Sequence, residues 1–459
     1  MNGAGLRRCA LLMSATVLAA SCAQAPATAP PPPPIVFVHG NGDSAALWHT
    51  TLWRFESNGW PRERLHAINM PYPQSRDADD LLQPGRSSST EHRQFLATEV
   101  QRVLAATGAR QVVLVGNSRG GNAIRSFIMN GGAAQVSHAI LGGTPNHGSW
   151  ADAGRQPANE FNGAGPFLTA LNNQGAAGIE ITPGPRWMTL RSDNNDKFAQ
   201  PDGEWLGAKD RPTNVGFDSP ELKGALNVVL PGADHREVSY SPRAFAASYR
   251  FITGREPATT AVLPEARVVL DGMVSGLGVG NEPARGGTVN NLPLAGAVVE
   301  VFATDAVTGE RIGPARWRKT VGADGRWGPF AADASSGYEF VISAAGYAVT
   351  HIYRSPFVRS SALVHLRAAV ADPAAAAAGS VVVFRRPRGY FGWPRDRISL
   401  GGQSPPPGVR AGVAEVAESR LALPALPQRA VVGEFNGERI TGRNWPASEN
   451  HVVQLELHD

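Results

Sequence analysis

Cysteine is almost absent from this chain of 459 residues, which contains two, Cys9 and Cys22. Both lie near the N-terminus, where Arg7 and Arg8 precede a short apolar run. A charged segment, a short apolar run and a zone of small residues predict an export signal, and its removal takes Cys9 with it. The exported chain then has no cysteine pair for an internal disulfide, so its packed cores must supply the stability.

Long apolar runs are also missing, because the N-terminal one is too short to cross a bilayer. It ends in LAASC, which resembles a bacterial lipobox with Cys22 as an acylated first residue; ordinary cleavage near Ala23 is the alternative. The next segment, APATAPPPPP, favours an extended tether. We therefore expect residues 1–34 to export the protein, either as an outer-membrane lipoprotein anchored through acylated Cys22 or as a secreted or periplasmic protein.

Charge is scarce, since 18% of the residues are charged and the net charge is +4. Lys and Arg are scattered and form no stripe, which argues against a nucleic-acid partner. No group of His, Asp and Glu residues has the spacing of metal ligands, so we expect no metal site and no cofactor, and a structural calcium ion is not indicated. A hydrophobic content of 42% excludes wholesale disorder, and the length predicts two or three domains.

Apolar runs and helical segments alternate over residues 35–254. The expected strands are 35–39, 65–69, 111–115, 138–141, 187–191 and 226–230, and the expected helices are 45–58, 88–108, 120–129 and 242–252. Continuous apolar strands are typical of a parallel sheet with helices on both faces. This pattern predicts an α/β catalytic domain over residues 35–254. Short β-branched runs broken by glycines then predict a β-sandwich domain over 265–370 and a second β-rich domain over 380–459.

A serine lies between two glycines in VVLVGNSRGGNAIR, residues 112–125, where an expected strand meets an expected helix. Gly-x-Ser-x-Gly in this context is typical of a nucleophile elbow, a sharp turn that exposes a hydroxyl in a cleft. Side chains at Gly116 and Gly120 would collide with the neighbouring strand and helix, so both positions require glycine. We therefore predict that Ser118 is the nucleophile of a hydrolase.

The base and the acid are expected later in the chain, in the order Ser, acid, His. His235 lies in a loop after the last expected strand, so we predict that it is the general base. The acid is expected after strand 187–191, where we favour Asp196 and keep Asp193 as the alternative. A carboxylate on the far ring nitrogen fixes the tautomer of the histidine and stabilises its charged form.

An oxyanion requires donors, and two backbone N–H groups are candidates. The first belongs to Asn41, which follows Gly40 at the end of the first strand, and the second belongs to Arg119, the residue after the nucleophile. Both would act through the backbone and not through the side chain. His39, just before Gly40, is expected to be a structural residue.

A long segment from Trp150 to Gly175 interrupts the α/β pattern. Loops of this length in a domain are often functional lids, although a surface loop without a role is the alternative. The apolar side chains that would cover an acyl groove are Phe161, Phe167, Leu168 and Leu171.

Together with PIVFVHGNGDSAALW, LGGTPNHGS and PGADHREV, the elbow segment resembles the α/β-hydrolase superfamily, and specifically the secreted microbial lipases and esterases. The resemblance covers about half of the chain and implies a serine hydrolase of carboxylic esters. Residues 292–347 resemble prealbumin-like sandwich repeats. In some lipases a β-rich C-terminal domain helps to hold apolar substrate. This chain departs from the lipase pattern at Asn117 and Arg119, where lipases commonly carry His and Met, and at Asn146.

We therefore expect an enzyme that cleaves carboxylic esters of a lipid or a polyester through an acyl-enzyme on Ser118. Two alternatives stay open. One is an extracellular depolymerase of polyhydroxyalkanoate or a similar polyester, whose β domains would dock through exposed aromatic residues, namely Trp317, Trp327, Phe391 and Trp393. We expect most of these four, however, to be core or turn residues. The other is a catalytically inactive surface-binding protein, and the presence of Ser, Asp and His candidates argues against it.

Overall fold

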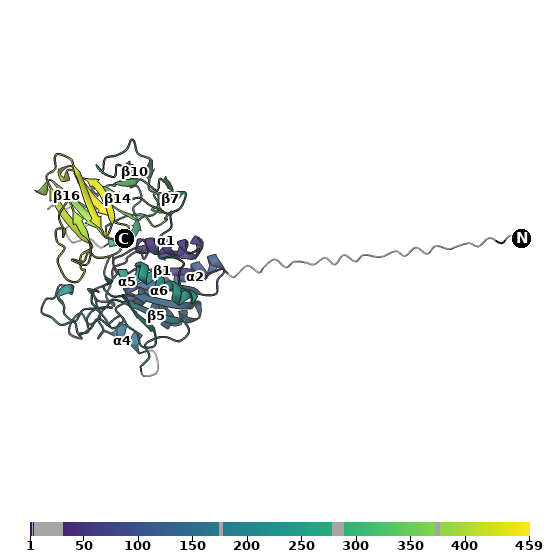
Figure 1. Ribbon diagram of the computed structural model, residues 1–459. Coiled ribbons are helices and arrows are strands. Elements are labelled where there is room, and N and C mark those ends of the chain that lie inside the picture. The colour runs from purple at the N-terminus through teal and green to yellow at the C-terminus, as the bar shows by residue number, and fades with distance from the viewer. Residues whose placement is uncertain (2, 4–30, 174–177, 278–288, 372–376) are drawn as a thin grey trace. The chain divides into compact units, whose positions relative to one another are not determined.

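Helices and a parallel sheet build the first half of the structure, and antiparallel and mixed sheets build the second (Figure 1). The computed structural model describes residues 1, 3, 31–173, 178–277, 289–371 and 377–459. The predicted signal, including Cys22, and Gly175 of the predicted lid lie outside these residues. No helix within the described ranges combines the length and apolarity that a membrane span requires.

The first half contains one six-stranded sheet in the order β2-β1-β3-β4-β5-β6, and all its neighbouring strands are parallel. The strands are β1 (Ile35–Val38), β2 (Leu65–Ile68), β3 (Val112–Asn117), β4 (Val136–Gly142), β5 (Arg186–Arg191) and β6 (Leu226–Val229). The helices are α1 (His49–Ser57), α2 (Ser89–Thr107), α3 (Arg119–Phe127), α4 (Pro166–Asn172), α5 (Glu237–Tyr240) and α6 (Pro242–Thr253). The expected α/β fold is confirmed, and α4 and α5 are additions to the expected helices.

Both faces of this sheet are buried, as the continuous apolar strands predict. Successive side chains of β1 point to opposite faces. Phe37 packs with α1, α5 and α6 in one core cluster, whereas Val36 and Val38 pack with α2 and α3 in another. Both clusters are assembled from residues of the first half alone.

The second half, or β region, begins after α6 and is built from strands. They are β7 (Val268–Leu270), β8 (Val274–Leu277), β9 (Val289–Pro293), β10 (Val298–Thr304), β11 (Trp317–Thr320), β12 (Phe330–Ala332), β13 (Gly337–Ser343), β14 (Val349–Arg354), β15 (Leu366–Arg367), β16 (Ser380–Arg385), β17 (Ile398–Leu400), β18 (Glu418–Leu423), β19 (Ala430–Phe435), β20 (Glu438–Arg443) and β21 (His451–Glu456). The largest sheet has seven strands in the order β11-β10-β13-β14-β21-β16-β18. Smaller sheets are β12-β7, β15-β8-β9 and β17-β19-β20.

The last strand joins the two β domains that the sequence predicts over 265–370 and 380–459. β21 lies between β14 and β16 and is parallel to both. The seven-stranded sheet therefore runs across the expected boundary without a break. The sequence pattern does not show this because the pairing partners of β21 are distant in the chain.

The four aromatic residues that would form a docking row in the polyester alternative lie in or against core clusters, as expected for most of them. Trp327 and Phe391 are 0% and 1% exposed, and both belong to core clusters. Trp317 and Trp393 are half-buried and pack against the same clusters. Aromatic side chains of this size stabilise a core more than a surface, so their place in the sheets is the usual one.

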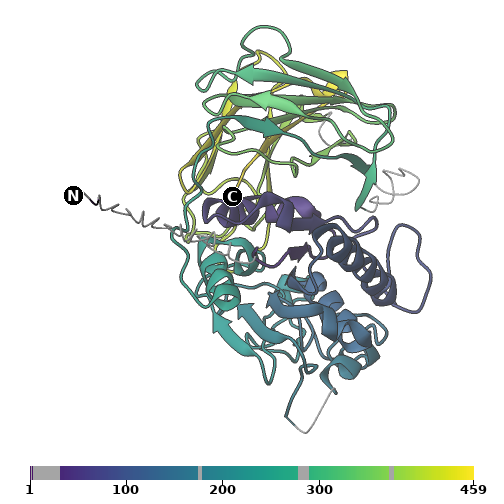
Figure 2. The same ribbon diagram turned by 90° about the vertical axis from the view of Figure 1, so that its right-hand side faces the viewer.

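Helix α1 connects the two halves, and Figures 1 and 2 show it between the parallel sheet and the β strands. Trp53 of α1 is buried in the core cluster of the β region, and its Nε1 donates to the carbonyl oxygen of Ser360 at 2.8 Å. Nδ1 of His49 lies 2.9 Å from Oγ of Ser361. The two halves therefore share one packed boundary.

Candidate active site

Ser118 occupies the turn between β3 and α3, and its backbone is strained. Its φ is 52° and its ψ is −123°, a conformation that non-glycine residues rarely adopt and that costs about 1–3 kcal/mol. Its N–H donates to the carbonyl oxygen of Gly142 on β4 at 2.9 Å, and its own carbonyl accepts from Gly121 N–H at 2.9 Å. The surrounding chain therefore holds the serine in the geometry of a nucleophile elbow.

The two glycines of the motif are needed for close approach. A Cβ on Gly116 would lie 2.7 Å from the backbone nitrogen of Gly121 in α3. A Cβ on Gly120 would lie 2.7 Å from the carbonyl oxygen of His39 at the end of β1. Real Cβ atoms do not make such contacts with backbone, so strand, turn and helix can pack this tightly only with glycine here.

His235 and Asp196 form a buried pair at the carboxyl ends of neighbouring strands. His235 follows β6, Asp196 follows β5, and both side chains are less than 5% exposed. Nδ1 of His235 lies 2.8 Å from Oδ1 and 2.9 Å from Oδ2 of Asp196. Since an ionised carboxylate only accepts hydrogen bonds, Nδ1 carries the proton and Nε2 is free to act as a base.

Asp193, the alternative acid, has a different environment. Its Oδ1 accepts hydrogen bonds from the N–H groups of Gly232 at 2.8 Å and Asn194 at 2.9 Å. Burial raises the pKa of the Asp193 carboxyl, but these backbone donors outweigh it and the net pKa is lowered. The structure therefore brings Asp196 to His235 and leaves Asp193 as a loop-bracing residue.

A cavity of about 150 Å³ lies at this site. Ser118 and His235 both line it, as do Gly40 and Asn41 at the end of β1. Arg119 is the first residue of α3, so its N–H has no partner within the helix, although Arg119 is not among the residues that line the cavity. The remaining wall is mainly apolar and contains Pro145, Trp150, Phe161, Phe198, Leu206 and Tyr390.

The predicted lid residues differ in position. Phe161 lines the cavity, but the other three lie on α4 and do not. Leu168 and Leu171 are 0% and 1% exposed, so they are core residues of this segment and are not free to cover a groove. Their spacing of three residues is typical of one face of a helix, and this spacing is the sequence signal for their buried position. Phe167 is half-buried on the same helix.

The departures from the lipase pattern have structural roles. Asn117 Nδ2 donates to the carbonyl oxygen of His235 at 3.1 Å. This hydrogen bond holds the loop that carries His235 against the residue before Ser118. The Arg119 side chain is fully buried, and its Nε lies 2.5 Å from Oε1 of Glu160 in the predicted lid segment. Burial raises the pKa of Glu160 to about 7 against the opposing effect of Arg119. Arg119 therefore links the elbow to the segment that precedes α4.

His39 is not part of the cavity wall. Its Nδ1 donates to the carbonyl oxygen of Gly40 at 2.9 Å, and its Nε2 accepts the N–H of Met70 at 3.1 Å. Burial lowers the pKa of His39, which favours the neutral ring that this pair of bonds requires. The structural role expected for this residue agrees with these contacts.

Tyr390 was not identified from the sequence as a site residue. It belongs to the β region and yet lines the same cavity as Ser118. The Lys197 ammonium and the Arg236 guanidinium lie 4.4 and 5.0 Å from its ring centre. A tyrosine so far along the chain from the elbow leaves no local pattern, so sequence analysis could not place it.

Two known families match parts of the chain. Residues 32–149 match the family described as lipase (class 2), and residues 266–370 match the family described as lipase C-terminal domain. No curated protein matches the chain.

Several solved structures of hydrolases are similar to it. The mature form of the lipase BlEst2 from Bacillus licheniformis has 21% identity over 49% of this chain and 94% of its own, with a TM-score of 0.36. The propeptide form has 15% identity over 90% and 92% of the two chains, with a TM-score of 0.36. A monoacylglycerol lipase from Paleococcus ferrophilus has 12% identity over 49% and 96%, with a TM-score of 0.33.

The parallel sheet and the strained turn at Ser118 give the first half the α/β-hydrolase fold. The two family matches confirm the resemblance to lipases and esterases with a β-rich C-terminal domain. The family matches together support a hydrolase of the lipase type.

Proposed function

We propose that this protein is a serine carboxylic-ester hydrolase that acts through an acyl-enzyme on Ser118. The observation that carries the proposal is the shared cavity of Ser118 and His235, with His235 paired to Asp196 behind it. Ser118 Oγ attacks the ester carbonyl carbon while Nε2 of His235 takes its proton, and the same proton leaves with the alcohol. Water then attacks the acyl-enzyme by the reverse route and releases the acid. This chemistry needs no cofactor.

The oxyanion of each tetrahedral intermediate is assigned to the N–H groups of Asn41 and Arg119. Asn41 lines the cavity, and its side-chain Oδ1 accepts the N–H of Ser75 at 2.8 Å, which holds the residue in place beside the cavity. The N–H of Arg119 lies at the start of α3, where the helix dipole favours negative charge. Two such donors in a site shielded from water stabilise the transition state by several kcal/mol, at about 3 kcal/mol each.

The cavity favours a short acyl group. Its volume of about 150 Å³ is below the roughly 300 Å³ at which pockets for drug-sized ligands begin. Its apolar wall suits a hydrocarbon chain, and a long chain would have to extend beyond it. The natural substrate is proposed to be an ester of a short acyl chain. The four aromatic residues of the polyester alternative lie in or against core clusters and do not favour it.

Export is proposed on the sequence alone. The N-terminal signal would carry the enzyme out of the cytoplasm, and acylation of Cys22 would anchor it to a membrane, with release of a soluble form as the alternative.

The test is turnover of p-nitrophenyl esters of increasing chain length by the wild type and by Ser118→Ala. We expect the rate with short acyl esters to exceed that with long ones, and we expect Ser118→Ala to lose turnover while its melting temperature stays close to that of the wild type. Undiminished turnover by folded Ser118→Ala would overturn the proposed mechanism. A preference for long chains would overturn the assignment of substrate.

A further inference from the structure

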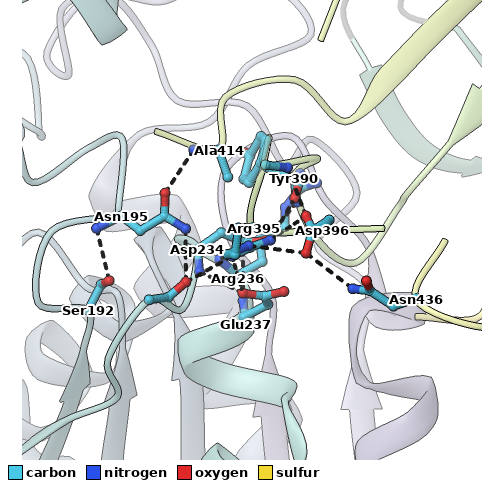
Figure 3. A network of polar contacts seen from close by, with 12 residues as sticks. Ser192, Asn195, Asp234, Arg236, Glu237, Tyr390, Arg395, Asp396, Ala414 and Asn436 are labelled. Atoms are coloured by element: carbon cyan, nitrogen blue, oxygen red, sulfur yellow. Dashed lines mark hydrogen bonds and ion pairs between the residues drawn. The ribbon is translucent and has the colours of Figure 1, made fainter. Parts of the chain in front are cut away.

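The residues directly before the acid and the base are both held by the β region. Asn195 precedes Asp196, and Asp234 precedes His235. Figure 3 shows the network that contains both of them, together with residues from the far end of the chain.

Asp234 fixes the turn that carries His235. Its Oδ1 accepts the N–H of Arg236 at 2.8 Å and that of Glu237 at 2.9 Å, so the backbone on the C-terminal side of His235 is bonded to the side chain on its N-terminal side. The N–H of Asp234 in turn donates to Glu237 Oε2 at 2.8 Å. Asp234 is 0% exposed. The orientation of the imidazole therefore depends on where this carboxylate is held.

The second oxygen of that carboxylate is held by the β region. Arg386 Nη1 and the N–H of Tyr390 each lie 2.8 Å from Oδ2 of Asp234. Arg386 Nη2 donates to Glu237 Oε1 at 2.6 Å and to Tyr240 Oη at 2.8 Å. One guanidinium thus reaches three side chains around the histidine turn. Its own side chain is 1% exposed, so water does not screen these contacts.

Asn195 gives the acid loop a similar support. Its Oδ1 accepts the N–H of Ala414 at 2.9 Å, and its Nδ2 donates to the carbonyl oxygen of Gly232 on the histidine loop at 2.9 Å. On the other side of Asp196, Lys197 Nζ donates to the carbonyl oxygen of Glu415 at 2.8 Å. The acid loop, the histidine loop and the β region are therefore bonded to one another at one place.

We propose that the segment from Arg386 to Glu415 is part of the catalytic apparatus, and that Arg386 is a positioning residue that sets the imidazole of His235 through Asp234 and Glu237. This inference rests on the proposed function, because it assigns a reason for the placement of the proposed base. The β region would then serve catalysis directly, beyond any role in stability or in holding substrate.

The position of Arg386 requires a side chain with two separate hydrogen-bond donors. Arg386 contacts Asp234 through Nη1 and Glu237 through Nη2, and the planar guanidinium keeps the two carboxylates at a fixed separation. Lysine would keep the charge but could not impose that separation. Methionine would keep much of the apolar stem and lose both the charge and the donors.

The experiment compares Arg386→Met and Arg386→Lys with the wild type in the full-length protein. The matched control is Arg311→Met, which removes another arginine of the β region from a carboxylate that is fully buried, that of Glu339. The substrate is a soluble p-nitrophenyl ester, and the measurements are kcat, KM, the pH profile of kcat/KM and the melting temperature.

We expect Arg386→Met to lower kcat by about 10- to 100-fold with KM unchanged, since a displacement of the base by about 1 Å has an effect of this size. Arg386→Lys should show an intermediate loss. In Arg386→Met the acidic limb of the kcat/KM profile should move to higher pH, because a positive charge near the base is lost while Asp234 and Glu237 stay. Arg311→Met should change the melting temperature and leave kcat and the pH profile as they are.

A folded Arg386→Met protein with wild-type kcat and pH profile overturns the proposal, and so does an equal loss of kcat in Arg311→Met. If Arg386→Met does not fold, Arg386→Lys decides by the same criteria. The proposed function fails separately: turnover retained by Ser118→Ala overturns it, whereas inactive Ser118→Ala beside fully active Arg386→Met overturns this inference alone.

Discussion

The two halves of the molecule differ in how far apart along the chain their paired strands lie. In the parallel sheet, β3, β4, β5 and β6 pair in the order in which they are made. In the β region the last strand returns to lie between β14 and β16, and His351 pairs with Val453. The pairing of β14 with β21 therefore spans more of the chain than any pairing in the parallel sheet, where β1 and β3 are the most distant partners.

The residues of the proposed active site lie mainly in the first half. Ser118, Asp196 and His235 all lie at the carboxyl ends of strands in the first half, which is where parallel sheets generally present their functional residues. Tyr390 completes the cavity wall from the second half. The wall of the cavity in the first half is therefore completed by a segment that lies far away along the chain.

The largest predicted loss of kcat concerns the carboxylate that pairs with His235. Asp196→Asn should lower kcat on the order of 10⁴-fold, because the amide favours the wrong tautomer of His235. Asp193→Asn should have a small effect, since that carboxylate bonds to loop backbone and not to the histidine. Steady-state kinetics of the two variants on one ester measures both. Equal losses, or a larger loss in Asp193→Asn, would contradict the assignment.

A smaller effect tests whether the halves are separable. Trp53→Ala should reduce the free energy of unfolding by about 3–5 kcal/mol, because it empties a site in the β core from a helix of the catalytic half. We expect the wild type and the variant to unfold in one transition, monitored in denaturant by tryptophan fluorescence and by residual activity. Two separate transitions, with the β region unaffected by the substitution, would contradict a packed boundary shared by the two halves.

The smallest expected effect is a loss of stability in acid. Burial holds the pKa of His49 and of His458 well below the usual value of 6.5, and these two rings stack at the boundary between the halves with centres 5.8 Å apart. The unfolded chain therefore takes up these protons first, so stability is constant above about pH 6.5 and falls below it, by at most about 1.4 kcal/mol per pH unit for each histidine.

The melting temperature between pH 5 and pH 8 measures this effect. His49→Gln should show a shallower decline below pH 6.5 than the wild type, because one of the protons taken up on unfolding is removed. A melting temperature that does not change between pH 7 and pH 5, or a steeper decline in the variant, would contradict the neutral buried rings.

Most of the first half could be predicted because its signals are local. The continuous apolar strands identified the parallel sheet, and a glycine pair at fixed spacing identified the turn at Ser118. Chain order then placed His235, and the loop after β5 left two choices for the acid. The lid prediction is wrong at Leu168 and Leu171, which form the buried side of a short helix within a Gly-rich segment.

The contribution of the second half could not be predicted. Arg386 and Asp234 are 152 residues apart, and an arginine that pairs with a distant carboxylate leaves no periodic pattern. The place of β21 in the sheet is hidden for the same reason, since its strand pattern fits any edge or centre. Such contacts depend on which surfaces meet after folding, and a single sequence contains no local sign of them.

The most direct measurement of the central claim is the site at which a fluorophosphonate probe reacts with the folded enzyme. We expect one covalent adduct, found by peptide mass spectrometry on Ser118, formed rapidly by the wild type and far more slowly by His235→Ala. An adduct on another residue, or no adduct on a folded protein that still hydrolyses esters, would contradict it.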